Sequence, residues 1–500
     1  MNAEVVARDA AATQLLALGK PALVWRDMVA DTETPVSAAL KLIEGGRGDF
    51  LLESVEGGAV RGRYSLIGLA PDLVFRAEGT LAELNTHWLT DRHAFEVLSE
   101  TTLVALRSLV ASCRIDVPEG LPSALACLVG YFGYETIGLV ESLARPPANP
   151  LGLPDMIFVR PTVVLVFDRL ADQLFVVAPV WPDGQVSDAL DRIKATMARL
   201  AQPLPARFAT SPQADLPAPR SVLAPDRYAE MVERARDYIA AGDVFQVVLA
   251  QRFTLPFTLP PFDLYRALRR INPSPFLYHL DLPGFALTGS SPEILVRVRD
   301  NEVTIRPIAG TRPRGKTATE DAEYRDSLLA DPKERAEHLM LLDLGRNDVG
   351  RVATAGSVTV TDSYTVEFYS HVMHIVSNVV GELKPEKDAL DALFAGFPAG
   401  TVSGAPKVRA CEIIAELEPE TRGAYAGGVG YFSPNGSMDS CIVLRTAILK
   451  DGVMHVQAGA GIVADSNAQY EQRECEAKAS ALMAAAREAV RVANEAGFGQ

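Results

Sequence analysis

Cysteine and histidine are scarce in this sequence, with 5 cysteines and 7 histidines among 500 residues. The cysteines lie far apart, form no C-x-x-C pair and are odd in number; they are Cys113, Cys127, Cys411, Cys441 and Cys475. This spacing predicts neither a disulfide framework nor a zinc site. We therefore expect a reducing, cytoplasmic compartment.

The sequence also lacks a basic surplus and a long apolar run. Its formal net charge is −15 at pH 7, which argues against a nucleic-acid or anionic-membrane surface because both need a basic patch. No apolar run reaches the roughly 18 residues of a membrane helix. Glu4 and Asp9 interrupt the segment where a signal peptide would be basic and then apolar. An anionic ligand must therefore meet a local positive site.

Hydrophobic residues make up 48% and charged residues 22% of the chain, which is typical of a globular protein with a large core. One segment interrupts the pattern, because residues 202–225 are rich in Pro, Ala and Ser and have no apolar periodicity. We expect a linker at 201–225 between an amino-terminal domain at 20–200 and a second domain at 226–490.

Short β-branched runs predict many strands. Residues 162–167 and 174–180 are typical of a hairpin. After the linker, apolar spacing predicts a helix over 226–241 and a strand over 245–253. Further strands are expected at 294–298, 302–305, 357–361, 440–449 and 453–460. Because few helices long enough for crossovers separate them, the pattern favours antiparallel sheets and an α+β class.

Two predicted helices each carry a Glu-x-x-Glu pair. Residues 331–344 place Glu334 and Glu337 one turn apart, and residues 468–493 do the same for Glu471 and Glu474, with Lys478 on that face. Each pair alone is typical of a solvated helix face. Two facing pairs would instead supply the hard oxygen ligands that Mg²⁺ prefers. The sequence leaves both interpretations open.

Two loops and one histidine-bearing segment add polar candidates. RPIAGTRPRG (306–315) holds three arginines and suits either a solvent loop or a cationic wall beside an anion. GTVSGAPK (400–407) could present backbone N–H groups to a carboxylate but lacks the P-loop spacing. His371 and His374 lie in YSHVMHIVS, where a lone histidine is more often structural than catalytic. No dinucleotide or serine-hydrolase motif accompanies them.

In order and spacing, several segments together resemble the chorismate-utilising enzymes. They are RPIAGTRPRG, DPKERAEHLMLLDLGRNDVGRV, GTVSGAPKVRA, GAYAGGVGYF, CIVLRTA, QAGAGIVADS and YEQRECEAKA, which together span some 170 residues from 306 to 479. FLLESVEGGAVRGRYSLIG (50–68) resembles the amino-terminal domain of anthranilate synthase component I. The resemblance implies two packed, largely antiparallel β-sheets flanked by helices, with the active site in the crevice between them.

The resemblance also implies roles for individual residues. Glu337 and Glu474 would bind Mg²⁺, with Glu334 and Glu471 close by, and the metal would chelate the ring carboxylate of chorismate. Positions that would hold the substrate carboxylates or line the site are Tyr425, Arg445, Gly461, Lys478, Gly310, Thr311 and Thr401. Glu293 matches a general acid that protonates the departing 4-hydroxyl, and His374 matches a residue placed against the reacting ring.

Two positions bear on which member of the family the chain resembles. Members that add water carry a lysine base where this sequence has Gln246, and ammonia needs no such base. Many aminodeoxychorismate synthases carry a nucleophilic lysine where this sequence has Ala309. Both substitutions favour attack by ammonia at C2 of chorismate, followed by loss of pyruvate to give anthranilate.

The amino-terminal motif resembles the tryptophan feedback pocket of anthranilate synthases. Residues expected to bind the inhibitor are Leu52, Glu53, Ser54, Asn272, Pro273, Pro275, Phe276, Leu277, Tyr431 and Cys441. Ordinary core packing, or the structural tryptophan site of aminodeoxychorismate synthases, would place similar residues there.

No glutaminase nucleophile motif is present, so the resemblance implies use of free ammonia, or of glutamine with a separate amidotransferase subunit. Two alternatives stay open. One is aminodeoxychorismate synthase component I, and the other is a catalytically silent, tryptophan-sensing subunit.

Overall fold

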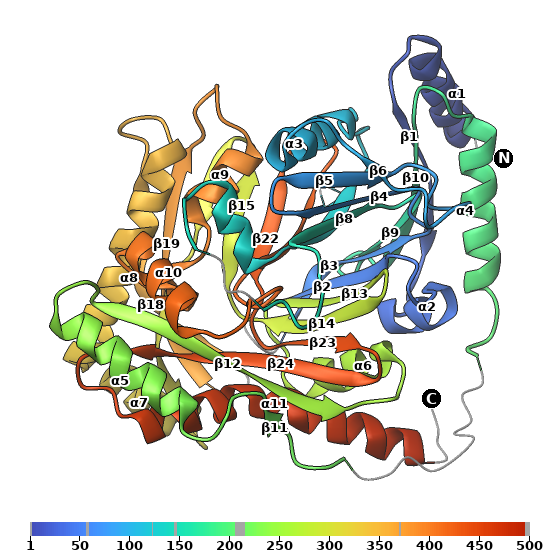
Figure 1. Cartoon of the computed structure of the whole chain (residues 1–500). Coiled ribbons are helices and arrows are strands. Elements are labelled where there is room, and N and C mark those ends of the chain that lie inside the picture. The colour runs from blue at the N-terminus through green and yellow to red at the C-terminus, as the bar shows by residue number, and fades with distance from the viewer. Residues whose placement is uncertain are drawn as a thin grey trace.

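The computed structural model describes residues 3–56, 60–122, 124–144, 148–205, 216–369 and 372–495. Two large antiparallel sheets pack against each other and carry helices on their outer faces (Figure 1). The expected α+β class and the two packed sheets are both confirmed. No helix in these ranges is long and apolar enough to cross a membrane.

Sheet A runs through eleven strands in one spatial path, with a further short strand paired to β12. In order, they are β1 (Ala22–Val29), β10 (Gln173–Val180), β9 (Val163–Asp168), β3 (Val60–Leu69), β2 (Asp49–Glu56), β13 (Phe276–Leu282), β14 (Phe285–Ser291), β23 (Thr446–Lys450), β24 (Val453–Ile462), β12 (Gln246–Pro256) and β11 (Arg220–Ser221), with β20 (Gly404–Ala405) beside β12. The predicted hairpin is β9 and β10.

Sheet B follows the same plan. In order, it contains β17 (Ile308–Pro313), β19 (Val372–Glu382), β16 (Glu302–Ile305), β15 (Ile294–Arg299), β22 (Met438–Ile442), β21 (Gly428–Phe432), β7 (Leu128–Phe132), β8 (Met156–Arg160), β4 (Leu73–Glu78), β5 (Leu81–Asn85) and β6 (Glu96–Val97), with β18 (Thr359–Phe368) beside β19.

Helices flank both sheets. They are α1 (Ala3–Ala17), α2 (Pro35–Leu42), α3 (Thr102–Ser112), α4 (Val186–Leu200), α5 (Arg227–Ala240), α6 (Pro261–Ile271), α7 (Ala318–Ala330), α8 (Pro332–Val352), α9 (Ala389–Gly396), α10 (Lys407–Leu417) and α11 (Ala468–Asn494), with two 3₁₀ turns, η1 (Tyr134–Leu139) and η2 (Gly400–Val402). In Figure 1, α11 runs below β24 and β12, and α1 and α4 lie at the opposite end of sheet A.

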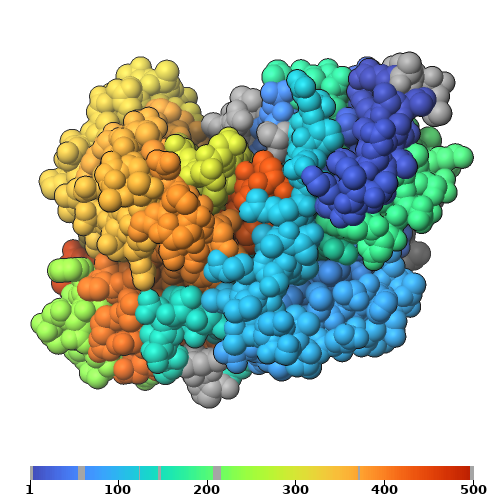
Figure 2. Space-filling view, turned by 90° about the horizontal axis from the view of Figure 1, so that it is seen from above, coloured from blue at the N-terminus to red at the C-terminus, as the bar shows by residue number. Residues whose placement is uncertain are grey.

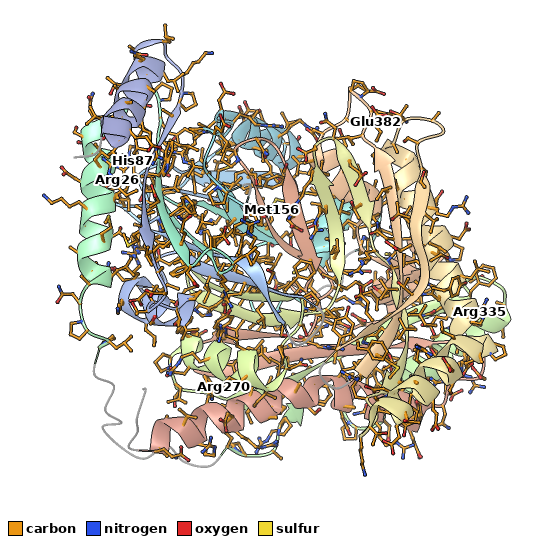
Figure 3. The ribbon with its side chains drawn as sticks, turned by 180° about the vertical axis from the view of Figure 1, so that it is seen from behind. Arg26, His87, Met156, Arg270, Arg335 and Glu382 are labelled. Carbon is orange, nitrogen blue, oxygen red and sulfur yellow. The ribbon has the colours of Figure 1, made fainter. Side chains whose placement is uncertain are left out.

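The core between the sheets is built from alternating strand residues. Phe50 and Leu66 of sheet A meet Val129, Tyr131 and Ile157 of sheet B in one buried cluster. Met156, fully buried on β8, lies near the middle of the molecule in Figure 3, whereas Arg26 and Arg335 lie toward its two ends. Apolar burial of this extent is the main stabilising term for such a sandwich.

Each sheet takes strands from both halves of the chain. In sheet A, β2 of the amino-terminal half pairs with β13 of the carboxyl-terminal half, and in sheet B β7 pairs with β21. Figure 2 shows cyan segments of the amino-terminal half packed directly against orange segments of the carboxyl-terminal half. Residues 206–215 of the expected linker lie outside the described residues. The boundaries at 20–200 and 226–490 therefore stay a prediction, although the two halves share both sheets.

One predicted strand is wrong. Residues 440–449 form the end of β22 in sheet B and the start of β23 in sheet A, so the chain crosses between the sheets inside that run. Arg445 lies at the crossing with a left-handed φ of 48°, a conformation that a regular strand cannot hold. The strand expected at 357–361 begins at Thr359 and continues to Phe368.

Candidate active site in the crevice between the sheets

Two crossings between the sheets meet at one place. The first leads from β14 in sheet A to β15 in sheet B and carries Glu293, and the second leads from β22 to β23 and carries Arg445. The Ile442 amide donates to the Glu293 carbonyl at 3.0 Å and the Ser290 amide donates to the Arg445 carbonyl at 3.2 Å. The predicted acid and the predicted carboxylate-binding arginine therefore lie close together, and the charge of Arg445 acts on the Glu293 carboxyl. We call the region around these two residues the crevice, after the position expected for the active site.

The Glu293 carboxyl is set to hold a proton near neutral pH. Its side chain belongs to a residue that is only 7% exposed, and burial raises its pKa to about 8. The Thr401 hydroxyl donates to this carboxyl, 3.2 Å from each oxygen, and lowers the pKa in part, as does the charge of Arg445. A carboxyl with this pKa can act as a general acid at pH 7.

His374 on β19 is held as a neutral ring. Its Nδ1 lies 2.9 Å from the Gly310 carbonyl oxygen and 3.1 Å from the Thr311 hydroxyl. Because a carbonyl only accepts, Nδ1 carries the proton and Nε2 keeps a lone pair. Burial lowers the pKa of His374 to about 4. His371, the other histidine of this segment, lies outside the described residues.

A bulge in β17 makes the His374 contact possible. The pairing of β17 with β19 shifts between Ala309 and Thr311, and Gly310 between them adopts φ of 71°. A side chain at Gly310 would begin 3.1 Å from Oε2 of Glu334, so glycine admits the close approach of α8. Gly310 in the bulge therefore contacts His374 through its carbonyl and lies beside Glu334 of the first Glu-x-x-Glu pair.

Each of the two Glu-x-x-Glu helices begins with a capped first turn, as predicted for α8. At the start of α8, the Asp331 carboxylate accepts from the amides of Lys333 and Glu334, and Pro332 occupies the first turn. At the start of α11, the Asn467 side chain accepts from the Tyr470 amide. Such caps satisfy otherwise unpaired amides and fix where each first turn lies.

The four glutamates share one electrostatic neighbourhood. Burial raises the pKa of Glu337, and the charges of Glu334 and Glu474 raise it further. Burial and the charge of Glu474 act in the same direction on Glu471. Lys478 opposes both effects, with its ammonium 2.7 Å from Glu474 Oε1 and 2.9 Å from the Gly459 carbonyl.

This donor set fits a magnesium ion in chemistry, although it is not a closed metal cage. Among the described residues, no three His, Cys, Asp or Glu side chains already converge as a metal site. Burial raises the pKa of Glu337 most, and the negative charges of Glu334 and Glu474 add to it; a divalent cation would favour the ionised form of this carboxyl. Carboxylate oxygens from two helices leave room for the waters and substrate oxygens that Mg²⁺ keeps.

The remaining predicted residues line the crevice from β12, β24 and the segment before β21. The Gln246 amide lies so close to Gly461 that an added Cβ would be 2.5 Å from its nitrogen. The Tyr425 hydroxyl approaches Gly459 in the same way, 2.9 Å from where a Cβ would stand. Glycine at both positions lets side chains from neighbouring elements close over β24.

Two residues of this crevice carry contacts that the sequence did not single out. Arg312 donates to Glu334 at 2.9 Å and to Asp331 at 2.7 Å, so one of the three arginines of the 306–315 loop pairs with α8. The Tyr369 ring lies edge-on to His374 at 5.3 Å between centroids. Arg312 lay in an arginine-rich motif, whereas nothing in the sequence marked Tyr369.

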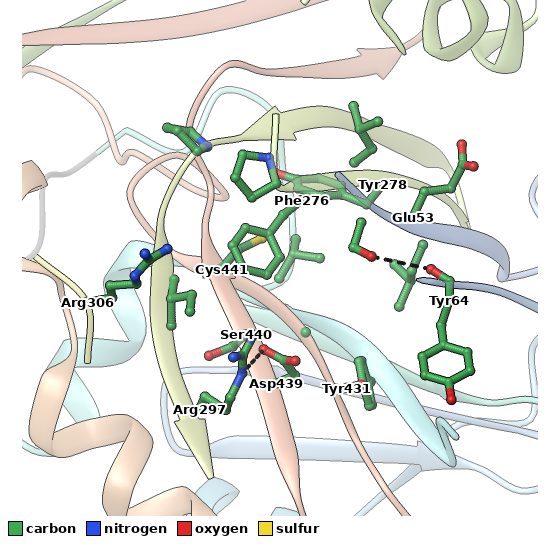
Figure 4. Close-up of a pocket in the computed structure, with 18 of the residues that line it drawn as sticks. Glu53, Tyr64, Phe276, Tyr278, Arg297, Arg306, Tyr431, Asp439, Ser440 and Cys441 are labelled. Carbon is green, nitrogen blue, oxygen red and sulfur yellow. Dashed lines mark hydrogen bonds and ion pairs between the residues drawn. The ribbon is translucent and has the colours of Figure 1, made fainter. Parts of the chain in front are cut away.

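A separate cavity of 660 Å³ opens between the sheets near the amino-terminal motif (Figure 4). Eight of the ten residues expected to bind tryptophan line it: Leu52, Glu53, Ser54, Pro275, Phe276, Leu277, Tyr431 and Cys441. Asn272 and Pro273 are not among the lining residues. Tyr369 lines this cavity and also touches His374, so the cavity and the crevice share a wall.

Glu53 differs from its neighbours in the cavity wall. Its carboxylate accepts from the Tyr265 hydroxyl at 2.6 Å and from Arg269 at 2.6 Å, and it pairs with Arg169. These bonds direct it away from Tyr431 and Cys441 in Figure 4. Glu53 therefore anchors β2 to α6, and its charge is already neutralised within the protein.

Comparison with known proteins places this geometry in a family. Residues 55–484 match the model of the chorismate binding enzymes. The chain is 51% identical over 487 residues to anthranilate synthase component 1 of Cereibacter sphaeroides, covering 96% of this chain and 97% of that protein. It is 46% identical to the protein of the same name from Thermus thermophilus, covering 92% and 96%.

Solved structures agree with these matches. The crystal structure of anthranilate synthase component I from Streptococcus pneumoniae superposes with a TM-score of 0.75 at 38% identity, covering 84% of this chain and 92% of that one. The menaquinone-specific isochorismate synthase from Escherichia coli has a TM-score of 0.71 at 20% identity, covering 96% and 99%, and shares the fold.

The Glu293 environment leads to a first prediction. Replacing Thr401 with valine removes the hydroxyl that donates to the Glu293 carboxyl, so the pKa of Glu293 should rise above about 8. Carboxyl ¹³C chemical shifts followed against pH, with Glu293→Gln to assign the signal, would measure it. The control Thr359→Val, on the exposed edge of β18, should leave this pKa unchanged. A lower pKa in Thr401→Val would contradict the assigned contact.

Proposed function

The chain belongs to the chorismate binding enzyme family, and we propose that within this family it is the synthase component of anthranilate synthase. It would aminate chorismate at C2 with ammonia, release the 4-hydroxyl as water and eliminate pyruvate to give anthranilate. The observation that carries this choice is the uncharged Gln246 amide packed against Gly461 in the crevice.

The nucleophile follows from what the crevice offers. Water needs a base to become a nucleophile, whereas neutral ammonia already presents a lone pair. Gln246 is 7% exposed and cannot take up a proton at neutral pH. Ala309, 8% exposed within β17, offers no side chain that could attack the ring. Both positions support direct attack by ammonia.

Glu293 and His374 supply the proton chemistry. Glu293, protonated because burial raises its pKa to about 8, would give its proton to the departing 4-hydroxyl. His374, neutral because burial lowers its pKa to about 4, would accept a proton through Nε2 when pyruvate leaves. A buried acid in the β14–β15 crossing and a neutral base on β19 can both act at one pH.

The charged side chains would bind and orient the substrate. Arg445 and Lys478 offer a guanidinium and an ammonium to the two carboxylates of chorismate, and Tyr425 closes one wall. Gly310 and Thr311 would line the opposite side, next to His374. Fixing a dianion between these groups positions its ring against the acid and the base.

Magnesium would be held by Glu337 and Glu474, with Glu334 and Glu471 as supporting partners. When bound, the ion would neutralise these carboxylates and draw the ring carboxylate of chorismate to them. Without such a cation, a dianionic substrate beside four glutamates would be repelled. The charges of Glu334 and Glu474, which add to the effect of burial in raising the pKa of Glu337, support this need for positive charge.

We further propose that the 660 Å³ cavity binds tryptophan and that binding lowers activity. Its aromatic and apolar lining, with Phe276, Leu52 and Tyr431, suits an indole ring. The polar side chains on its wall, among them Arg297 and Asp439 joined at 3.2 Å, suit an amino acid's charges. The shared wall at Tyr369 supports an effect on His374.

The proposal includes a separate glutamine amidotransferase subunit that supplies ammonia. The relatives' designation as component 1 supports a second component. A reducing, cytoplasmic compartment remains part of the proposal, in keeping with five buried and unpaired cysteines.

Activity can be tested directly on the purified chain. Incubation with chorismate, Mg²⁺ and ammonium at alkaline pH, where more ammonia is unprotonated, should yield fluorescent anthranilate and an equal amount of pyruvate. Chromatography of the products would distinguish the alternatives. Aminodeoxychorismate or isochorismate in place of anthranilate would overturn the proposal. Binding of tryptophan without any turnover of chorismate would indicate the silent sensing subunit.

Magnesium ligation is tested by Glu474→Gln, which removes one negative charge from the shared neighbourhood while keeping the size of the side chain. Turnover that depends on Mg²⁺ should be lost, and calorimetry should show weaker Mg²⁺ binding. Circular dichroism should be unchanged. Glu476→Gln is the matched control, because this exposed residue of the same helix bonds only to Gln472 among the described contacts. Near-normal activity of Glu474→Gln would show that the assigned ligand is wrong.

The tryptophan site is tested by Phe276→Ala, which removes an aromatic wall from the cavity. The inhibition constant for tryptophan should rise by roughly 2- to 10-fold, in line with an aromatic contact worth about 0.5–1.5 kcal/mol, while kcat changes little. Phe95→Ala removes a similar ring beside Trp88, away from the cavity, and should leave inhibition unchanged. If the inhibition constant for tryptophan is the same in both variants, tryptophan does not bind in this cavity.

A further inference from the structure

Arg422 is a buried cation that no predicted role covers. It lies five residues beyond the end of α10, and the whole residue is 2% exposed. Its ion-pair partner Glu418, in the same segment, is 4% exposed. Removing two charges from water is costly unless the interior supplies strong hydrogen bonds in return. The contacts of Arg422 therefore indicate which role this buried ion pair has in the protein.

The guanidinium makes four hydrogen bonds with four of its five N–H donors. It donates to both Glu418 oxygens, at 2.9 Å from Nε and 2.6 Å from Nη2. Nη1 donates to the Val402 carbonyl and Nη2 to the Val248 carbonyl, each at 2.7 Å. One planar group thus connects the end of α10, the η2 turn and strand β12.

Each of the two carbonyls lies next to a residue of the proposed site. Val402 follows Thr401, whose hydroxyl donates to Glu293. Val248 lies two residues after Gln246 and pairs with Gly461 across the strands. The same side chain therefore fixes the position of the η2 turn relative to β12, and these two elements carry Thr401 and Gln246.

The guanidinium also packs against a third wall of the crevice. Its central carbon lies 5.6 Å from the Tyr425 ring centroid and 4.6 Å from that of Tyr134. The backbone is held as well, because the Arg422 amide donates to Glu135 at 2.7 Å and the Gly423 amide donates to the same carboxylate at 3.0 Å. The two rings and the bonded backbone together restrict where the guanidinium can lie.

We propose that Arg422, clamped by Glu418, is a positioning residue that holds Thr401, Gln246 and Tyr425 in register around the substrate. This role rests on the proposed function. A buried ion pair adds little to stability over an apolar pair of similar volume, whereas its fixed donors can align several carbonyls at once. Arginine is needed because lysine, a point charge, cannot bond a carboxylate and two separate carbonyls from one plane.

The experiment compares Arg422→Lys and Glu418→Asp with the wild-type chain. Both variants keep the charges. Arg422→Lys replaces the planar guanidinium with a single ammonium, and Glu418→Asp shortens the accepting side chain by one methylene. We expect kcat for anthranilate formation to fall on the order of 10- to 100-fold, as misplacement of catalytic groups by about 1 Å does. KM for chorismate should change less, because Arg445 and Lys478 are untouched. Thermal melting would be recorded for each protein.

The matched control is Arg160→Lys. Arg160 makes a bidentate pair with Asp72, at 2.8 Å and 3.0 Å, on β8 and outside the crevice. The Arg160→Lys substitution should lower the melting temperature, while kcat of the folded enzyme should stay at the wild-type value. If both Arg422→Lys and Glu418→Asp behave like this control, or if neither folds, Arg422 serves stability and the proposal is overturned. An inactive wild-type chain would instead refute the proposed function.

Discussion

Hydrogen bonds between two crossing segments hold the crevice in place. Ser290 donates to the carbonyl of Arg445, the Ser291 hydroxyl to that of Ile442 at 2.6 Å, and the Ile442 amide to the carbonyl of Glu293. A chain that leaves one sheet for the other exposes backbone groups that must be paired when they are buried. Because each crossing pairs with the other, the acid and the arginine come together as a consequence of how the sheets are joined.

Charge in the crevice is balanced across several elements. Four glutamates on α8 and α11 meet Lys478 on α11 and Arg312 on β17. Burial has the largest effect on the pKa of Glu293 and of Glu337, and the weakly screened neighbouring charges then modify each pKa. Glu293 stands apart from this group, close to Thr401 and Arg445. That separation lets one carboxyl stay protonated while others remain available to a cation.

Sequence reasoning reached the fold class and most strands and helices because each has a local signal. The β9–β10 hairpin follows from β-branched runs, α5 from apolar periodicity and α11 from an alanine-rich composition, and α8 begins at Asp331 as expected. The crossing inside 440–449 escaped, since a β-branched run has the same alternation whether or not it changes sheet. Helical spacing predicted the two Glu-x-x-Glu pairs and placed Glu474 and Lys478 on one face, where they form an ion pair. The other site residues were found by resemblance, and their contacts depend on the tertiary fold. Arg422 escaped because its role depends on carbonyls far along the chain.

The cavity and the crevice meet at residues that belong to both. Tyr369 faces His374 and lines the cavity, and Pro292 in the cavity wall precedes Glu293. Close-packed interiors pass small displacements on because they have few voids in which to absorb them. A ligand in the cavity that displaces Tyr369 or the β14–β15 crossing would therefore also displace His374 or Glu293. Because residues of β2 and β3, among them Leu52 and Tyr64, line the same cavity, Tyr369 and Pro292 connect the amino-terminal half of the chain to the proposed site.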